Sequence, residues 1–149
     1  MARVTRKRTL DASLEDVWKL VSDPYNLPRW WPRASRVENV EGGGGRRTRW
    51  TMVLETSEGR GVRADFRCVS SAEKERYVWE QELAGTPFER HLKGLRVEVR
   101  MRERDGGAEI SLTEEQSLKG MSKLGSPLMR RARGDVLDNA LDGIARALG

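Results

Sequence analysis

The clearest alternation of apolar and polar residues runs from Leu95 to Arg102, where every second residue is apolar and the residues between are arginine or glutamate. Such a period-two pattern predicts a β-strand with one buried face. The same pattern, less regular, predicts six more strands at residues 4–10, 35–41, 50–54, 62–68, 77–83 and 110–118. The run Asp105-Gly106-Gly107 is a typical hairpin signal. We therefore expect an antiparallel sheet with one face in solvent.

Two helical segments are predicted between the first two strands. Ser13 is a good N-cap, and the residues after it place apolar side chains on one helical face. These residues are Leu14, Val17, Trp18 and Val21. Pro24 ends this helix, because proline cannot continue the hydrogen-bonding ladder. Asn26 as a cap, followed by Pro28 in the first turn, predicts a second and very short helix.

The last segment predicts one long helix, with Ser126 as its cap and Pro127 at its first position. Roughly twenty residues at about 1.5 Å each would cross a whole sheet. The predicted apolar stripe is Met129, Ala132, Val136, Ala140, Ile144 and Leu148, widened by Leu137 and Leu141. Gly134 and Gly143 lie inside this helix, and each costs about 1 kcal/mol relative to alanine. We expect them to leave room either for packing or for a ligand.

The composition predicts one soluble domain covering residues 1–149. Of the 149 residues, 34% are charged, and the net charge is +5. The single cysteine, Cys68, excludes an internal disulfide and a multi-cysteine metal site, and its place in an alternating strand favours a small core residue. No apolar stretch is long enough to span a membrane, and the basic first residues lead into no apolar segment. We therefore expect a cytoplasmic protein.

Three stretches of the chain carry a resemblance to a known family: "EDVWKLVSDP", the "PRWWP" that follows it, and "YVWEQELAGTP" further on. Together with the order of predicted elements, they resemble the START and birch-pollen-allergen-like (SRPBCC) superfamily, and within it the polyketide cyclase/dehydrase-like bacterial branch. The resemblance implies an α+β helix-grip fold. In this fold a curved antiparallel sheet of about seven strands wraps around the long C-terminal helix, and two short helices follow the first strand. Tyr25, Trp30 and Trp31 would then plug or gate the mouth of a cavity between sheet and helix. The alternative is a filled core that Trp30 and Trp31 complete.

The resemblance implies that the cavity binds a small hydrophobic molecule such as a lipid, a polyketide or an aromatic metabolite. The expected ligand-binding residues are Trp30, Trp31, Trp50, Met52, Phe66, Tyr77, Trp79, Val97, Leu112, Glu114, Gln116, Val136, Leu137, Ala140 and Leu141. An alternative is a polyketide cyclase or dehydratase that uses the same cavity. A second alternative is an interaction module that uses a basic surface. We expect no nucleic-acid partner, and either a monomer or a homodimer.

The candidates for acid–base chemistry are Glu114, His91 and Tyr77. Glu114 and Gln116 share the parity of the apolar residues in their strand, so a carboxylate facing an apolar cavity could donate or accept a proton. The alternative is that the strand twists and both side chains reach solvent. His91 is the only histidine, and it lies either at a hairpin end or in a pocket. The sequence has no metal-ligand spacing and no phosphate loop, so we expect no metal and no cofactor.

Arginine-rich stretches at residues 46–49, 96–104 and 130–133 allow two interpretations. They could form a phosphate-binding surface. In the first two stretches, arginines alternate with apolar residues, which favours a solvated outer face with cross-strand ion pairs. The third stretch is predicted on the outer face of the last helix, where cations oppose the helix dipole.

Overall fold

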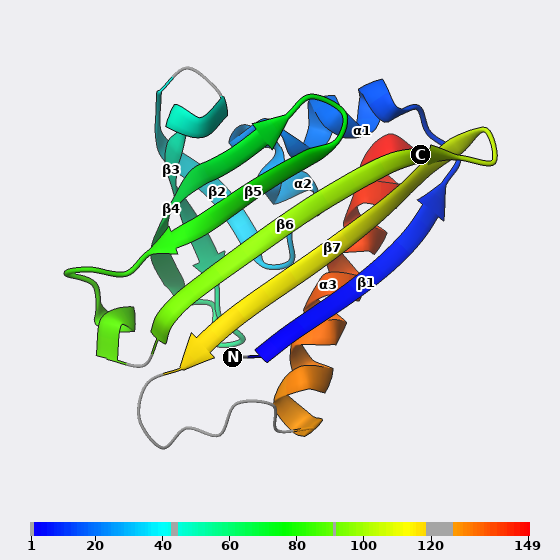
Figure 1. Cartoon of the computed structure of the whole chain (residues 1–149). Helices are drawn as coiled ribbons and strands as arrows, with labels where there is room; N and C mark the ends of the chain where they lie inside the picture. The colour runs from blue at the N-terminus through cyan, green and yellow to red at the C-terminus, as the bar shows by residue number, and fades with distance from the viewer. Residues whose placement is uncertain (1, 43–44, 91, 119–126) are drawn as a thin grey trace.

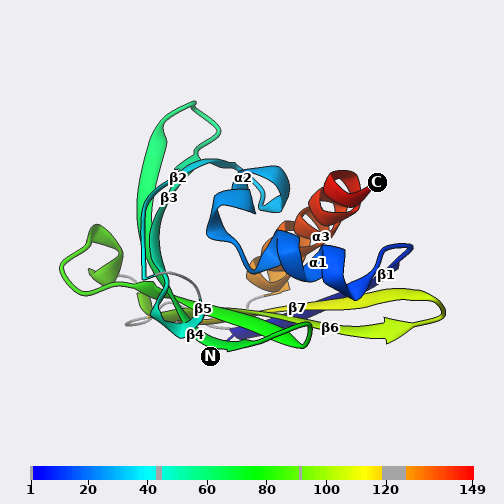
Figure 2. The same ribbon diagram turned by 90° about the horizontal axis from the view of Figure 1, so that it is seen from above.

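Seven antiparallel strands form one curved sheet, and a long helix lies along its concave side (Figures 1 and 2). The computed structural model describes residues 2–42, 45–90, 92–118 and 127–149. The strands are β1 (Ala2–Leu10), β2 (Ala34–Glu41), β3 (Arg49–Glu55), β4 (Gly61–Ala72), β5 (Arg76–Glu82), β6 (Leu92–Arg104) and β7 (Gly107–Leu118). The helices are α1 (Leu14–Val21), α2 (Leu27–Trp30) and α3 (Pro127–Leu148), and the 3-10 turns are η1 (Pro24–Asn26), η2 (Gly45–Arg47) and η3 (Pro87–Arg90). The predicted helix-grip architecture is confirmed.

The β6–β7 hairpin turns where the sequence predicted a turn. Arg104 pairs with Gly107, and the two residues between them, Asp105 and Gly106, have φ angles of 52° and 80°. Positive φ at both central positions is the type I′ turn, whose twist matches that of the flanking strands. Asparagine, aspartate and glycine tolerate this conformation better than other residues. The Asp-Gly pair therefore fixes the register of the two longest neighbouring strands.

The first strand lies at one edge of the sheet, beside a strand from the far end of the sequence. The order is β1-β7-β6-β5-β4-β3-β2, so β1 and β7 are the only neighbours that are not consecutive in the chain. Their register runs from Ala2 opposite Gln116 to Leu10 opposite Ala108. Because β7 precedes α3, this pairing also brings β1 beside the C-terminal helix (Figure 1).

Ion pairs join β1 to α3. Arg6 pairs with Asp138 at 3.5 Å, and Arg8 forms a hydrogen-bonded pair with Asp142. Two residues of a strand span about 6.6 Å and four residues of a helix about 6 Å, so the spacing of the arginines matches that of the aspartates. These ion pairs add to the apolar contacts of β1, where Ala2 and Val4 are buried.

The helix α3 presents the predicted face to the sheet over its C-terminal half, but the prediction is wrong at Ala132. Leu137, Ala140, Leu141 and Ile144 are fully buried, whereas Val136 is half-buried and Ala132, part of the predicted stripe, is exposed. The buried face also includes Gly134 and Gly143, which a count of apolar side chains overlooks. A methyl group on Gly143 would lie 2.3 Å from the carbonyl oxygen of Trp30. This glycine therefore serves packing, because it lets α2 rest directly on α3. The predicted cap of α3, Ser126, lies outside the described residues.

The two short helices after β1 are confirmed, with one change in their capping. The Ser13 hydroxyl accepts a hydrogen bond from the Asp16 backbone N–H at 3.1 Å, as expected of an N-cap. Asn26 lies at the N-cap position of α2, as predicted, but its side chain makes no capping hydrogen bond. The turn before it, η1, has its own cap in Asp23, whose carboxylate accepts a hydrogen bond from the Tyr25 backbone N–H.

Candidate ligand-binding site

A cluster of aromatic side chains fills the concave side of the sheet around Trp79. The ring centroid of Trp79 lies 6.0 Å from that of Trp30, 5.6 Å from Trp31 and 6.1 Å from Trp50. It also lies 6.2 Å from Tyr77 on the same strand. The tryptophan pairs cross at 70° to 75°, an edge-to-face arrangement that the ring quadrupoles favour. Trp79 is therefore the central residue of the cluster.

The remaining predicted binding residues lie around this cluster. From the sheet, Met52, Phe66, Val97 and Leu112 are buried on the same side, and α3 adds Leu137, Ala140 and Leu141. Phe66 stacks on Trp50 with ring centroids 6.1 Å apart. Gln116 and Val136 are half-buried. The candidate His91 lies outside the described residues.

The segment that follows α1 supplies the cover of the cluster. Trp30 and Trp31 are 2% and 8% exposed, and their rings contact each other as well as Trp79. The expectation that Tyr25 joins them is wrong, because its side chain is 62% exposed. The 3-10 turn η1 points Tyr25 away from the interior, and the α2 helix after it turns the two tryptophans inward.

The interior is closely packed. A cavity of about 10 Å³ lies between Ala2 and Val4 on β1, Glu114 and Gln116 on β7, and the helix. That volume is at most that of one small water site. The sequence left open whether the cavity is open or filled, and in the structure the tryptophans fill this space.

Three polar atoms of the cluster are buried without a hydrogen-bond partner among the described residues. They are the indole Nε1 of Trp30, the indole Nε1 of Trp50 and the hydroxyl of Tyr77. Burial raises the pKa of Tyr77 well above its usual range, and the nearby Cys68 adds to the rise. The phenol therefore stays protonated and can serve as a hydrogen-bond donor. Burial likewise raises the pKa of the Cys68 thiol, which keeps it un-ionised.

Glu114 faces the helix, as its place in the alternation predicted, and is only 2% exposed. Both of its carboxylate oxygens accept hydrogen bonds from Arg133 of α3, one of them at 2.6 Å from Nε. A bidentate guanidinium pair of this kind fixes the position of the carboxylate. The expectation that residues 130–133 lie only on the outer face of the helix is thus wrong for Arg133. Its long side chain reaches back to the sheet.

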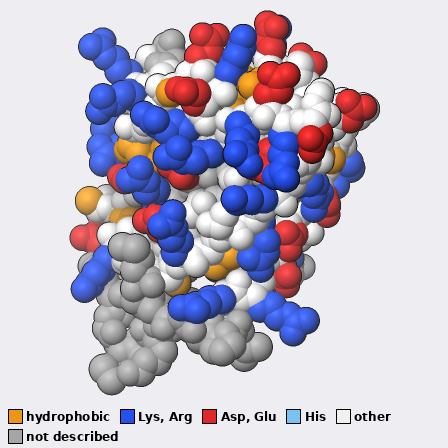
Figure 3. Space-filling model, turned by 45° about the vertical axis from the view of Figure 1, so that its right-hand side comes forward, with side chains coloured by type: hydrophobic (Ala, Val, Ile, Leu, Met, Phe, Trp, Pro, Cys, Tyr) orange, Lys and Arg blue, Asp and Glu red, His pale blue; other side chains and the backbone are white. Residues whose placement is uncertain are grey.

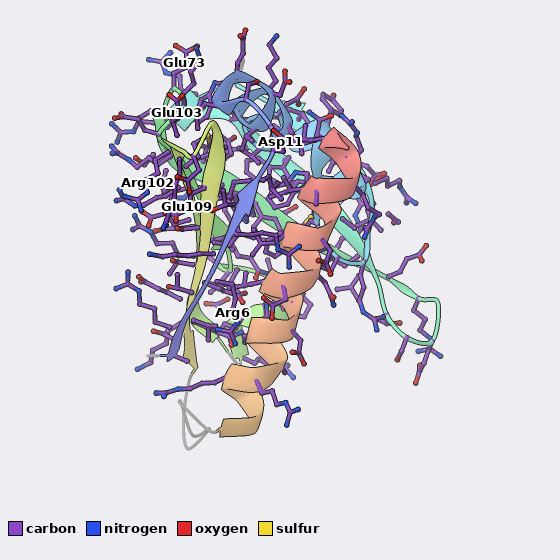
Figure 4. The ribbon with its side chains drawn as sticks, turned by 90° about the vertical axis from the view of Figure 1, so that its right-hand side faces the viewer. Arg6, Asp11, Glu73, Arg102, Glu103 and Glu109 are labelled. Carbon is purple, nitrogen blue, oxygen red and sulfur yellow. The ribbon has the colours of Figure 1, made fainter. Side chains whose placement is uncertain are left out.

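The outer face of the sheet carries the cross-strand ion pairs that the alternation predicted. Glu80 on β5 lies 3.5 Å from Arg67 on β4 and 3.8 Å from Arg96 on β6. Glu109 accepts hydrogen bonds from Arg102 and Arg104, which hold the pKa of its carboxyl below the usual range. Figure 4 places Arg102 and Glu109 on the side of the sheet away from α3. In Figure 3 basic and acidic side chains are mixed over the visible surface. This neutralises much of the basic stretch at residues 96–104.

A wide hollow opens where β5 and β6 separate. These strands pair only from Arg76 opposite Arg100 to Glu80 opposite Arg96, and beyond that point they diverge (Figure 1). The crevice between them has a volume of about 640 Å³. Most of its lining residues are outward-facing and charged, but Gln81, Leu83 and Leu95, which share the parity of Trp79 and Val97, also line it. The crevice therefore reaches toward the concave side.

The described residues show no arrangement for a metal and no span for a membrane. No group of three or more histidine, cysteine, aspartate or glutamate side chains among residues 2–42, 45–90, 92–118 and 127–149 is placed to hold an ion. Within the same ranges no helix has the length and apolar character needed to cross a bilayer.

The family model for "Polyketide cyclase / dehydrase and lipid transport" matches residues 1–149. The chain belongs to this family. No curated protein matches its sequence. Among solved structures it is similar to a START superfamily protein from Mycobacterium smegmatis, with a TM-score of 0.77 and 14% identity over 99% of this chain and 97% of that one.

Two further structures show how widely the fold is shared. The chain is similar to Ara h 8.0201, with a TM-score of 0.73 and 17% identity over 98% of this chain and 96% of that one. It is also similar to the di-domain ARO/CYC StfQ from the steffimycin biosynthetic pathway, with a TM-score of 0.76 and 13% identity over 99% of this chain and 50% of that one. At such identities the likeness shows the fold alone, since unrelated functions share one fold.

Two residues of the site were missed from the sequence. Trp18 of α1 contacts Tyr77 with ring centroids 6.2 Å apart, and Arg133 binds Glu114. The helical pattern predicts that Trp18 lies on the buried face of α1. It does not predict which strand that face meets, so the contact with Tyr77 could not be found. The reach of Arg133 has no signal in one sequence, because an arginine at a helix start resembles any solvated cation.

Proposed function

We propose that the chain binds a small, mainly apolar molecule that carries a hydrogen-bond acceptor, on the concave side of the sheet around Trp79. The observation that carries this proposal is the set of buried donors without partners, on Trp30, Trp50 and Tyr77. Each such group costs about 1–3 kcal/mol when it is left unsatisfied. A carbonyl or ether oxygen of a ligand would accept from these donors, and its carbon skeleton would pack among the indole rings.

Binding requires the tryptophan cover to move. The cover is a helix of only four residues, α2, and its tryptophans fill the space that a ligand would take. The crevice between β5 and β6 supports a route to the interior, since Gln81, Leu83 and Leu95 connect its charged rim to the apolar side. A volume of 640 Å³ is within the range of small-molecule pockets, which is about 300–1,000 Å³.

The family description favours a polyketide cyclase type of reaction as the second candidate. Such a reaction needs a group that moves protons. Glu114 is held by Arg133, and Tyr77 remains protonated because its pKa is raised. Both groups suit the orientation of a ligand better than proton abstraction, which is why we place binding first. A pH–rate profile that changes on Glu114→Gln would favour the enzyme.

The experiment is native mass spectrometry of protein purified without denaturation, followed by organic extraction and identification of the released compound. The compound, or the neutral probe Nile red if the protein is empty, is then titrated into the wild type and into Tyr77→Phe. The matched control is Tyr25→Phe, which changes the exposed one of the two tyrosines. Loss of one buried hydrogen bond predicts about fivefold to tenfold weaker binding of the compound in Tyr77→Phe and unchanged binding in the control. A protein that releases no compound on extraction and does not bind Nile red would refute the proposal.

A further inference from the structure

A second hollow, of about 300 Å³, lies on the far side of the tryptophan pair. It is formed by α2, the residues after it and the C-terminal half of α3, which lie side by side in Figure 2. Three arginines from three segments line it: Arg29 of α2, Arg33 of the turn that follows, and Arg146 of α3. The close approach of Gly143 to the Trp30 backbone places α2 directly against α3, which brings Arg29 and Arg146 to the same hollow.

None of these three guanidinium groups has a carboxylate partner within 4 Å among the described residues. Arg29 donates to the backbone carbonyl of Ala147 at 3.3 Å, and Arg33 to that of Glu55 at 3.3 Å. Neutral carbonyl groups orient the two side chains but leave their charge uncompensated.

The hollow contains one acidic residue, Asp142. Its carboxylate is already bound by Arg8 of β1, on the other side of the helix seam. The lining therefore carries three cations against a single carboxylate that is satisfied elsewhere. The lining also includes the polar side chain of Asn139 and the residues Trp30 and Trp31.

The backbone at Arg33 is unusual. Its φ angle is 63°, a left-handed conformation that is uncommon for residues other than glycine, asparagine and aspartate. Glycine would adopt it without strain. An arginine at this position is costly for folding, and such strained residues cluster at functional sites. The conformation gives a reason to look for a role of the guanidinium group itself.

We propose that this hollow binds a phosphate group. A phosphate carries up to two negative charges and enough oxygens to accept from three guanidinium groups at once, whereas a carboxylate offers two oxygens and one charge. Arginine is the side chain best suited to planar, paired hydrogen bonds with phosphate oxygens. The hollow shares Trp30 and Trp31 with the concave-face site, but its three arginines take no part in that site, so the proposal does not depend on the ligand proposed there.

The test measures the thermal midpoint and the calorimetric affinity of the whole chain with inorganic phosphate, against chloride at the same ionic strength. A second arm measures co-sedimentation with phosphatidylcholine vesicles that contain phosphatidic acid, because a lipid headgroup carries the same chemistry. The variants are Arg33→Gly and Arg146→Gln. The control is Arg60→Gln, an exposed arginine that does not line the hollow.

We expect phosphate to raise the midpoint of the wild type and of Arg60→Gln. Each of the two site variants should weaken phosphate binding about tenfold or more, the usual effect of losing a charge-assisted hydrogen bond. Arg33→Gly should keep or raise the midpoint without phosphate, since it relieves backbone strain, so its loss of binding would not reflect misfolding. Vesicle binding that is lost in both site variants, with no response to free phosphate, would assign the site to a lipid headgroup. Absence of both responses, or equal losses in Arg60→Gln, would overturn the proposal.

Discussion

Alanine at the two glycines of α3 should change the stability of the protein in opposite directions. A Cβ at Gly143 would lie 2.3 Å from the carbonyl oxygen of Trp30, 2.7 Å from its Cα and 2.8 Å from its carbonyl carbon. These are backbone atoms, so they move only if α2 moves. Overpacking of this kind costs about 1–3 kcal/mol, and more where backbone must shift. The higher helix propensity of alanine offsets about 1 kcal/mol of this cost. The expected result is a net loss of about 1–2 kcal/mol.

Gly134 provides the matched comparison. A Cβ there would lie 2.2 Å from Nη2 of Arg6 and 2.8 Å from its Cζ, which are at the end of a flexible side chain. Arg6 can rotate away, and the cost is its pair with Asp138, in which both side chains are at least 40% exposed. Exposed pairs contribute between zero and about 1 kcal/mol. With the same gain in helix propensity, Gly134→Ala should stabilise the protein by about 0.5 kcal/mol.

The assay is urea denaturation followed by tryptophan fluorescence and by far-ultraviolet circular dichroism. With a slope of about 1–3 kcal/mol per molar urea, the two variants should have midpoints on opposite sides of the wild type. The near-ultraviolet spectrum of Gly143→Ala should also change, because the displaced backbone carries Trp30. A Gly143→Ala variant as stable as the wild type would contradict the contact between α2 and α3. Equal losses at both glycines would mean that the Trp30 backbone is not the cause.

Two more predictions concern buried titratable groups. Arg133→Gln should destabilise the protein by about 1–3 kcal/mol more than Glu114→Gln. Arg133→Gln leaves the buried carboxylate of Glu114 without a partner, whereas in Glu114→Gln the 31% exposed side chain of Arg133 can still reach water. Denaturation of the two variants side by side checks the order, and equal losses would show that solvent reaches Glu114. In Tyr25→Phe, Tyr77 is the remaining tyrosine, and its raised pKa should prevent tyrosinate absorbance at 295 nm until the protein unfolds. Since the unfolded state releases this proton near pH 10 and the folded state holds it, stability should fall as pH rises above that value. A tyrosinate signal from the folded protein near pH 10 would disprove the burial of the hydroxyl.

The alternation of side chains predicted the sheet well because it depends on local geometry. Every second residue of a strand faces the same side, so the inward set from Trp50 to Leu112 could be assigned without knowing which strands are neighbours. The Asp105-Gly106 turn was predictable for the same reason, since it depends on two residues and their allowed φ angles. These features required no knowledge of distant contacts.

The errors came from contacts between segments far apart in the sequence. The role of Gly143 in α3 was not predictable, because it packs against a backbone more than a hundred residues earlier and a glycine adds nothing to an apolar count. Whether the cavity is open or filled was not predictable, because strand parity shows which side chains face inward but not how much volume they fill. Four rings packed within 6.2 Å of Trp79 fill that volume. The arginines of the second hollow come from α2, the turn after it and α3, and only the fold brings them together.

The pairing of β1 with β7 also constrains how the chain can fold. From β2 to β7 each strand pairs with the next one in sequence, so six strands can form successive hairpins as the chain grows. In contrast, Ala2 can pair only after Gln116 has been added to the chain, and Arg8 can form its ion pair only after Asp142 has been added. Closing loops of this length is entropically costly and slows folding. Although β1 comes before its partner strand in the chain, it is therefore among the last strands to pair, and the edge of β7 stays unpaired until then.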